Sequence, residues 1–245
     1  HGHALLAPEL VQPDRRPQRN VRVRRIGQQL AQRGQGPRVA RLAQRLAEVA
    51  RLRAEAWGVL AAALEYPDAE LVALIREGAL MRRARELIGT LHPELEATIA
   101  WAALADVPTD DGLAIEYSRL FDPIGPSGPA CPLNSGALVG DDGRMKLLEE
   151  LVRFYNHFGL TAAGAPGNEL PDHVLAQLDF LHFLSQREAE CLVEGEGADD
   201  FRRARVDFQR RHPGRWAPDL VERLERHQAH SYYLTLARLI QHLAM

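Results

Sequence analysis

The sequence predicts an all-α protein, and two observations carry that prediction. From residue 39 to the C-terminus, apolar residues recur at intervals of three and four, which is the spacing of a helix that buries one face. No segment shows the strict alternation of apolar and polar residues that marks a half-buried strand. With 245 residues, 46% of them hydrophobic and 26% charged, the chain is long enough for one or two domains with a substantial core.

The first half of the chain is expected to form antiparallel helices, which are short after the first one. The first spans about residues 39–64, and Leu46 and Leu60 belong to its apolar face. Tyr66-Pro67-Asp68 ends this helix, because proline cannot continue it. Pro67 or Asp68 then opens a short helix that ends near Gly78, and further helices are expected at about 80–91 and 93–104.

The second half of the chain alternates longer helices with loops. The expected helices cover about residues 110–121, 145–158, 171–193, 199–211 and 217–243. A long Pro/Gly-rich loop follows at 122–132, and a second loop rich in Gly, Ala and Pro covers 161–169. Gly159 suits a left-handed helix cap, Pro171 suits a helix start, and His212–Arg215 separates the last two helices.

Charge divides the chain into a basic arm and an acidic body. Residues 1–53 carry twelve arginines against three acids, whereas residues 54–245 carry eighteen basic and thirty acidic residues, a net charge of −12. Residues 1–37 mix prolines and glycines with arginines and show no sustained periodicity, so we expect a disordered arm there and a helical domain over 38–245. The acidic body excludes nucleic acid as a partner and favours a basic one. Residues 15–25 of the arm could fold back on that body.

The sequence also indicates a compartment. Cys131 and Cys191 lie sixty residues apart, outside any disulfide, zinc or haem pattern, which favours a reducing environment. No apolar run approaches the roughly 18 residues that span a bilayer, and the first thirty residues lack the apolar stretch of a secretory signal. We therefore expect a cytoplasmic protein without membrane insertion.

Common catalytic motifs are missing from the sequence. There is no phosphate-binding loop, dinucleotide fingerprint, HExxH or GxSxG. Only Asp179 and His182 approach the Glu-x-x-His pairs of a di-iron site, and His227 and His230 have the spacing of ordinary surface residues. We expect no catalytic residue and no metal site, but a helical metalloenzyme or nucleotide hydrolase that uses Asp172, His173 and His182 stays open as an alternative.

Two short motifs are candidates for a binding surface. Glu116–Phe121 (Glu-Tyr-Ser-Arg-Leu-Phe) ends a helix just before the Pro/Gly-rich loop, and acids at Glu116 and Asp122 flank its aromatic face. A groove with an apolar floor and acidic rims would suit a peptide that carries arginines beside an apolar run. Leu170–His173 (Leu-Pro-Asp-His) opens the next long helix, where Asp172 either caps the first turn or faces its positive end as an anion, with His173 on the adjoining surface.

Taken in order, these motifs resemble one family of proteins. The series runs from Glu116–Phe121 through Pro132 and Ser135 to Gly159-Leu160, then Leu170–His173 and Leu178–Leu181. Over about residues 55–245 it resembles the TorD/DmsD/NarJ family of molybdoenzyme maturation chaperones. Pro129–Leu133 and the segment 144–155 are most similar to the chaperones of type II enzymes of the DMSO reductase family, such as ethylbenzene and dimethylsulfide dehydrogenases and selenate and chlorate reductases.

This resemblance implies a fold and a function. The fold would be a single-domain, all-helical bundle of the TorD-like type, as a monomer or a swapped dimer. The protein would be a cytoplasmic, non-enzymatic, system-specific chaperone of anaerobic respiration. It would bind the apo molybdenum catalytic subunit, and could bind its twin-arginine signal peptide, until bis-molybdopterin guanine dinucleotide is inserted. No cofactor would be bound tightly by the chaperone itself. A permanent structural subunit of a respiratory complex is the other alternative.

The resemblance also implies which residues contact the client. The expected contacts are Glu116, Tyr117, Leu120, Phe121, Pro132, Ser135, Tyr155, Pro171, Asp172, His173 and Phe180. The sequence departs from the family pattern at two places near these contacts. Leu133-Asn134-Ser135 stands where many members have an aromatic residue, and Gln177 stands where many have glutamate.

Overall fold

The protein is built from helices, as the sequence predicts. The structure is a computed structural model that describes residues 37–107, 111–123, 128–138, 141–160 and 170–245. Within these ranges it contains no β-strand, only one isolated antiparallel bridge between Asn134 and His173. No helix in the same ranges is long and apolar enough to cross a bilayer. The predicted disordered arm lies outside the described residues, apart from Pro37 at the first turn of a helix.

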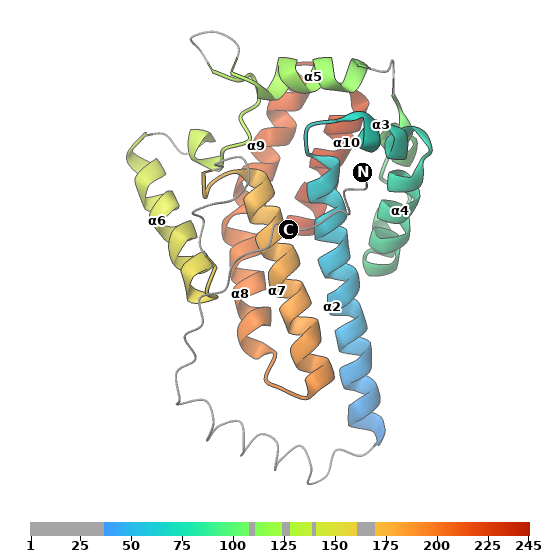
Figure 1. Cartoon of the computed structure of the whole chain (residues 1–245), viewed down its shortest axis with the longest axis vertical. Coiled ribbons are helices and arrows are strands. Elements are labelled where there is room, and N and C mark those ends of the chain that lie inside the picture. The colour runs from blue at the N-terminus through green and yellow to red at the C-terminus, as the bar shows by residue number, and fades with distance from the viewer. Residues whose placement is uncertain (1–36, 108–110, 124–127, 139–140, 161–169) are drawn as a thin grey trace, which may run out of the picture.

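Two long antiparallel helices form the centre of the fold. Helix α2 (Pro37–Ala63) confirms the helix predicted over 39–64, and α7 (Val174–Glu194) confirms the one predicted from Pro171 to about 193. They lie side by side along the long axis of the molecule (Figure 1). Helix α4 (Ala79–Leu91) packs against α2, and α8 (Asp199–Arg211) packs against α7.

The short N-terminal elements follow the prediction in part. Helix α3 (Ala69–Arg76) begins after Asp68, whose carboxylate accepts a hydrogen bond from the Leu71 amide at 2.8 Å. Such a bond satisfies one of the amides left without an intrahelical partner in the first turn. The helix predicted over 93–104 is wrong, because this stretch forms two separate 3-10 helices, Pro93–Leu95 and Trp101–Ala105.

The C-terminal region contains one more helix than the sequence predicts. The segment 217–243 is not continuous: α9 (Pro213–Arg226) and α10 (Ser231–Ala244) meet at a turn where Gln228 has φ 51°. No proline or glycine marks this turn, so the apolar spacing on either side concealed it. Helix α5 (Gly112–Phe121) lies across the end of the bundle, and α6 (Asp141–His157) stands at its side (Figure 1).

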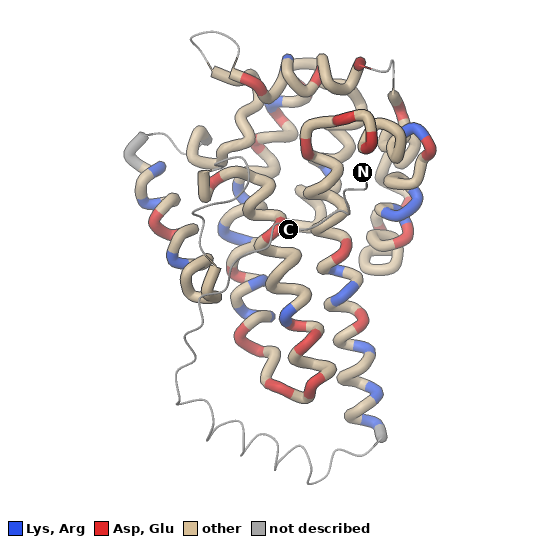
Figure 2. The backbone as a smooth tube through the Cα atoms, viewed as in Figure 1, with Lys and Arg blue, Asp and Glu red and all other residues tan. Residues whose placement is uncertain are grey.

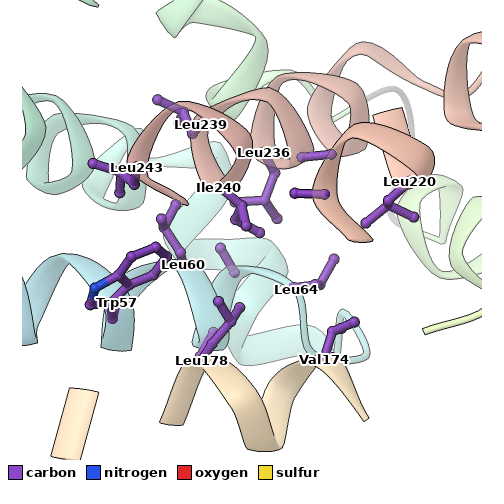
Figure 3. Close-up of a cluster of buried hydrophobic side chains, with 14 of the residues drawn as sticks. Trp57, Leu60, Leu64, Val174, Leu178, Leu220, Leu236, Leu239, Ile240 and Leu243 are labelled. Carbon is purple, nitrogen blue, oxygen red and sulfur yellow. The ribbon is translucent and has the colours of Figure 1, made fainter. Parts of the chain in front are cut away.

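The main core lies where α2, α7, α9 and α10 meet. Trp57, Leu60 and Leu64 of α2 point towards Leu178 of α7 and Ile240 of α10 (Figure 3). These side chains are almost wholly removed from water, and each buried aliphatic side chain stabilises the fold by about 1.5–3 kcal/mol. The four helices therefore form a frame against which the shorter elements pack.

A second, aromatic part of the core attaches α6 to that frame. Phe154 and Tyr155 of α6 contact Phe180 of α7 and Phe208 of α8, with ring centroids 4.9–6.4 Å apart. His212, which is 2% exposed between α8 and α9, packs against the Phe208 ring at 4.4 Å. Among the described residues, neither ring nitrogen of His212 has a hydrogen-bond partner, and Nε2 lies 3.5 Å from a Glu150 carboxylate oxygen of α6.

The environment of His212 favours its neutral form. Burial is the largest cause, and the positive charges of Arg211 and Arg215 add to it, while Asp207 opposes them; together they lower the pKa of His212 to about 4. An unfolded chain has a histidine pKa near 6.5. Between these two values the unfolded chain binds more protons than the folded one, so folding becomes less favourable as the pH falls.

We predict that His212 makes the free energy of unfolding depend on pH. Its contribution is fully present above about pH 6.5 and is lost as the pH falls through about 4, a loss of roughly 3 kcal/mol. Replacing His212 with Phe keeps a ring between Phe154 and Phe208 but removes the titrating group. Urea unfolding at pH 7.5, 5.5 and 4.5 should show a smaller loss in His212→Phe than in the native chain. Equal losses in the two proteins would contradict the prediction.

Candidate functional site

The turn before α7 is held by a buried aspartate. The Asp172 carboxylate accepts hydrogen bonds from the Asn134 side-chain amide at 3.1 Å and from the Gly136 amide at 2.9 Å. Its backbone carbonyl accepts three more, from the Ser135 amide and hydroxyl and from the Gln177 side chain. Asp172 is 0% exposed. We call the group formed by Asn134, Ser135, Gly136, Asp172 and Gln177 the Asp172 hub.

Gln177 extends the Asp172 hub to a third element. Its amide nitrogen donates to both the Ser135 hydroxyl and the Asp172 carbonyl at 2.9 Å, and its oxygen accepts from the Trp216 indole at 2.8 Å. An ionised glutamate in this position could accept the indole bond but could not donate the other two. Gln177, which replaces the glutamate of the family pattern, therefore fits the hydrogen-bond donors and acceptors around it.

The start of α7 differs from the sequence prediction. The N-cap is His173, whose ring Nδ1 accepts from the Leu175 amide at 3.3 Å, so the prediction that Asp172 caps the first turn is wrong. Asp172 instead faces the loop on its other side. The carboxylate finds donors there because Leu133–Ser135 pairs with 172–174 as a short antiparallel bridge.

A second junction lies at the end of α5. The Glu116 carboxylate forms a bidentate pair with Arg119, at 2.7 Å for both bonds, and also accepts from the His230 amide at 2.8 Å. Burial by itself would raise the pKa of Glu116, but the bonds from Arg119 and His230 hold it below its ordinary value. Arg119 also donates to the His227 carbonyl at 3.2 Å. These contacts fix α5 to the turn between α9 and α10.

The aromatic residues at this end of α5 are partly covered. Tyr117 packs edge-on against Phe121 and Tyr233, with centroids 4.9 and 6.2 Å apart, and against Tyr66 at 5.4 Å. Phe121 is 7% exposed, whereas Tyr66 is 55% exposed. The aromatic surface available here is therefore that of Tyr66 and Tyr117, and the sequence prediction did not include Tyr66.

One segment joins the two junctions. The Cys131 amide donates to the Leu120 carbonyl at the end of α5, at 2.8 Å. Two residues later the Leu133 carbonyl accepts from the Val174 amide at 2.8 Å, at the start of α7. Residues 131–136 thus link the motifs Glu116–Phe121 and Leu170–His173, which are far apart in the sequence. The centre of the predicted Pro/Gly-rich loop, residues 124–127, lies outside the described residues.

The predicted contact residues divide into two groups by exposure. Those at the rim are half-buried: Glu116, Tyr117, Pro132, Pro171 and His173. The others are between 0% and 7% exposed: Leu120, Phe121, Ser135, Tyr155, Asp172 and Phe180. In this structure the hub covers Asp172, and neighbouring aromatic rings cover Phe121 and Phe180. Their part in client binding stays a prediction.

Residues that the sequence prediction missed complete the site. Asn134, Gly136 and Trp216 bind within or beside the hub. Leu170, from the predicted motif Leu170–His173, is 46% exposed next to the hub. Tyr155, by contrast, was predicted, and its hydroxyl donates to the Pro171 carbonyl at 2.9 Å. The proline-rich loop and Leu170–His173 were visible in the sequence, but no local signal could pair Trp216 with Gln177 across 39 residues.

The residues of the enzymatic alternative are not brought together. His173, the N-cap of α7, and His182 lie nine positions apart, which is about 14 Å along a helix. The His182 ring nitrogen Nδ1 lies 2.8 Å from the Ala54 carbonyl of α2. In the part of the chain that the structure describes, no three His, Cys, Asp or Glu side chains could hold a metal ion. Burial raises the pKa of Cys131 to about 11, so its thiol is a poor nucleophile.

Comparison with known proteins identifies the family. The family model described as nitrate reductase delta subunit matches residues 82–222, more than half of the chain. The chain belongs to the nitrate reductase delta subunit family. This confirms the resemblance to the TorD/DmsD/NarJ proteins that the ordered motifs indicate.

Several curated relatives of this family are similar to the chain. A perchlorate reductase assembly chaperone protein of Dechloromonas aromatica is 30% identical, over 77% of this chain and 85% of its own length. A selenate reductase assembly chaperone protein of Thauera selenatis is 34% identical, over 51% of this chain and 67% of its own length. A chlorate reductase assembly chaperone protein of Ideonella dechloratans is 36% identical, over 46% of this chain and 58% of its own length. No solved structure matches the chain significantly.

We predict that Gly136 is required at the hub. A Cβ atom added there would lie 2.5 Å from Asp172 Oδ2 and 3.0 Å from Arg144 Cγ, so the carboxylate would have to move away from the Gly136 amide. Gly136→Ala should lower the free energy of unfolding by about 1–3 kcal/mol.

Gly197→Ala provides the matched control for this change. A Cβ atom at Gly197 meets nothing within 4 Å, so this variant should unfold within about 1 kcal/mol of the native chain. Denaturant unfolding of the two variants checks the prediction. If both variants were equally stable, the close packing of Gly136 against Asp172 would be irrelevant to the fold.

Proposed function

We propose that this protein is an assembly chaperone for a molybdenum enzyme. It binds the catalytic subunit while that subunit lacks its cofactor, and it releases the subunit after loading without catalysing a reaction. The observation that carries this proposal is the shared description of the relatives as reductase assembly chaperone proteins, with an alignment over 77% of this chain for the perchlorate reductase relative. In this proposal the cofactor, bis-molybdopterin guanine dinucleotide, belongs to the client and is not held tightly by the chaperone.

The rim of the Asp172 hub is the surface that we assign to the client. Leu170 is exposed, and Pro132, Asn134, Pro171 and His173 are half-buried around the fully covered Asp172. The hub holds these groups in place without a partner, so that little conformational entropy is lost when a client segment binds. In this proposal Asp172 positions the rim residues, and those residues contact the client.

A client arginine would bind at Glu116 by exchange. Arg119 occupies the Glu116 carboxylate, and its side chain is 44% exposed, whereas that of Glu116 is 17% exposed. An arriving guanidinium would replace the bonds of Arg119 to Glu116 with equivalent ones, while the His230 amide keeps its bond to Glu116. Tyr66 and Tyr117 lie beside this pair and offer apolar contact to the residues that follow an arginine.

The twin-arginine signal peptide is the ligand that this arrangement suits best. Arginines beside an apolar run match a carboxylate beside exposed aromatic rings. Binding would take place in the cytoplasm, before export of the loaded subunit. Whether the protein acts as a monomer or as a swapped dimer stays a prediction.

A permanent subunit is the second candidate, because the family description itself speaks of a delta subunit. The two candidates differ in what happens after the cofactor is inserted. A chaperone is absent from the mature enzyme, whereas a structural subunit is present in it at a fixed ratio. Quantitative mass spectrometry of the purified mature enzyme separates them.

We predict that the protein co-purifies with an apo molybdenum subunit. A tagged chain is expressed together with the molybdenum catalytic subunits encoded in its own genome, in cells with and without molybdate. Complexes should accumulate without molybdate and decrease when cofactor is available. If no apo-subunit and no leader peptide is recovered in either condition, the proposed function is wrong.

We predict opposite effects for the two residues of the Glu116–Arg119 pair. Glu116→Gln keeps the acceptor for the His230 amide but removes the charge, and should weaken binding of a labelled leader peptide about tenfold, which corresponds to about 1.4 kcal/mol. Arg119→Gln removes the competitor and should strengthen binding a few fold. Fluorescence anisotropy measures both dissociation constants. Equal weakening in the two variants would mean that the pair is only structural.

A further inference from the structure

The N-terminal part of α2 carries an apolar stripe that the described residues leave uncovered. Val39, Leu42, Leu46 and Val49 are between 40% and 56% exposed, and their spacing of three, four and three places them on one helical face. Further along the same helix, Trp57 and Leu60 are 1% exposed. The end of α2 that bears the stripe extends beyond the turn between α7 and α8 (Figure 1).

A groove continues the stripe towards α7 and α8. Its volume is about 370 Å³, and Leu46, Val49 and Leu192 form its apolar part. Its charged lining is balanced: Glu188, Glu196 and Asp199 lie among Arg53, Arg202 and Arg205, and Arg202 pairs with Asp199 at 2.6 Å. Acidic residues gather on the turn between α7 and α8, whereas arginines follow the exposed end of α2 (Figure 2).

We propose that residues 21–33 of the same chain form a helix that packs antiparallel on this stripe. Val23, Ile26 and Leu30 have the spacing of one helical face, three and then four residues apart. In an antiparallel pairing centred on residue 36, Leu30 faces Leu42, Ile26 faces Leu46, and Val23 faces Val49. This register is that of a helical hairpin.

The residues between the two helices suit such a hairpin. Gly34-Gln35-Gly36 separates the segment from Pro37, with which α2 begins. Glycine permits a tight turn and proline is favoured in the first turn of a helix, and antiparallel helices are commonly joined by two to five residues. A connection this short also keeps the segment at a high effective concentration beside the stripe.

The short connection favours this occupant over a second copy of the chain. A second copy of α2 would bring Arg38, Arg41 and Arg45 to the stripe, and the segment 21–33 brings Arg22, Arg24, Arg25 and Arg33, so like charges oppose both occupants. Tethering separates them, because a three-residue connection gives the segment a local concentration at the stripe that a second molecule lacks.

The docked segment would lie far from the proposed client surface. The stripe occupies the N-terminal half of α2, whose 27 residues span about 40 Å, and α5 lies across the opposite end (Figure 1). The segment would cover apolar surface and would not compete with a client at Glu116. This changes our expectation for residues 21–33, which the sequence by itself predicts to be disordered.

Cysteine pairs in the full chain test the register. Ile26→Cys with Leu46→Cys places two thiols on facing positions, where a disulfide can form if the Cα atoms lie within about 7 Å. Gln28→Cys with Leu46→Cys is the control, because residue 28 lies on the opposite face of the segment. The native Cys131 and Cys191 are buried and should not react. Under mild oxidation, the first pair should form an intrachain disulfide at least tenfold faster than the second.

Three results would overturn the proposal. Equal rates for the two pairs, or no intrachain disulfide in either, would mean that the segment has no fixed place on the stripe. An interchain disulfide in the single Leu46→Cys variant would assign the stripe to a second copy. Ile26→Asp, compared with Gln28→Asp, gives an independent measure: only Ile26→Asp should increase hydrogen exchange of the α2 amides at 38–50, by about tenfold. None of these results depends on client binding.

Discussion

The buried carboxylate of Asp172 is the interaction on which the site depends. An isolated charge in a protein interior is strongly unfavourable unless hydrogen bonds replace its water. Here the donors are Asn134, just before the 3-10 helix Ser135–Leu138, and Gly136, within that helix. The Asp172 carboxylate and residues 134–136 therefore stabilise each other: the residues supply its hydrogen bonds, and the carboxylate holds them in place. Truncating such a group would leave unpaired donors behind and would destabilise more than the bonds themselves contribute.

The same network explains how a small segment can connect three distant parts of the chain. Residues 131–136 contact the end of α5 through Cys131 and the start of α7 through Leu133, while Gln177 reaches Trp216 on α9. Each bond by itself contributes about 1 kcal/mol, but bonds that share donors and acceptors stabilise one another. The rim residues are held by this network from several sides. A surface arranged in this way can be preorganised although it consists mainly of loops.

The sequence predicted the elements well and the contacts between them poorly. Apolar spacing predicted α2 and α7 to within a few residues, because apolar residues recur at threes and fours over many turns of each, including the exposed stripe Val39–Val49 of α2. It failed at the turn around Gln228, where positive φ occurs at a residue other than glycine, and at 93–104, where 3-10 helices replace an α-helix. It also placed Asp172 on the surface, since an acid before a helix usually caps it. Only the tertiary structure, through Asn134 and Gly136, makes burial of that acid favourable.

Net charge and contact chemistry make different contributions to recognition in this protein. Residues 54–245 carry a net charge of −12, but many of their carboxylates already pair with arginines of the same chain, as Glu116 does with Arg119, Glu55 with Arg83 and Glu188 with Arg205. A net charge of this kind increases the rate at which a basic partner arrives. The strength of the final contact depends instead on whether a partner can replace an internal arginine. Glu188 is a poor candidate, because its side chain is 8% exposed and Arg205 is equally buried. Glu116 is better placed, because its own partner is exposed and its remaining bond, to the His230 amide, does not have to break. Specificity for an arginine-bearing segment therefore follows from the accessibility of one ion pair more than from the total charge.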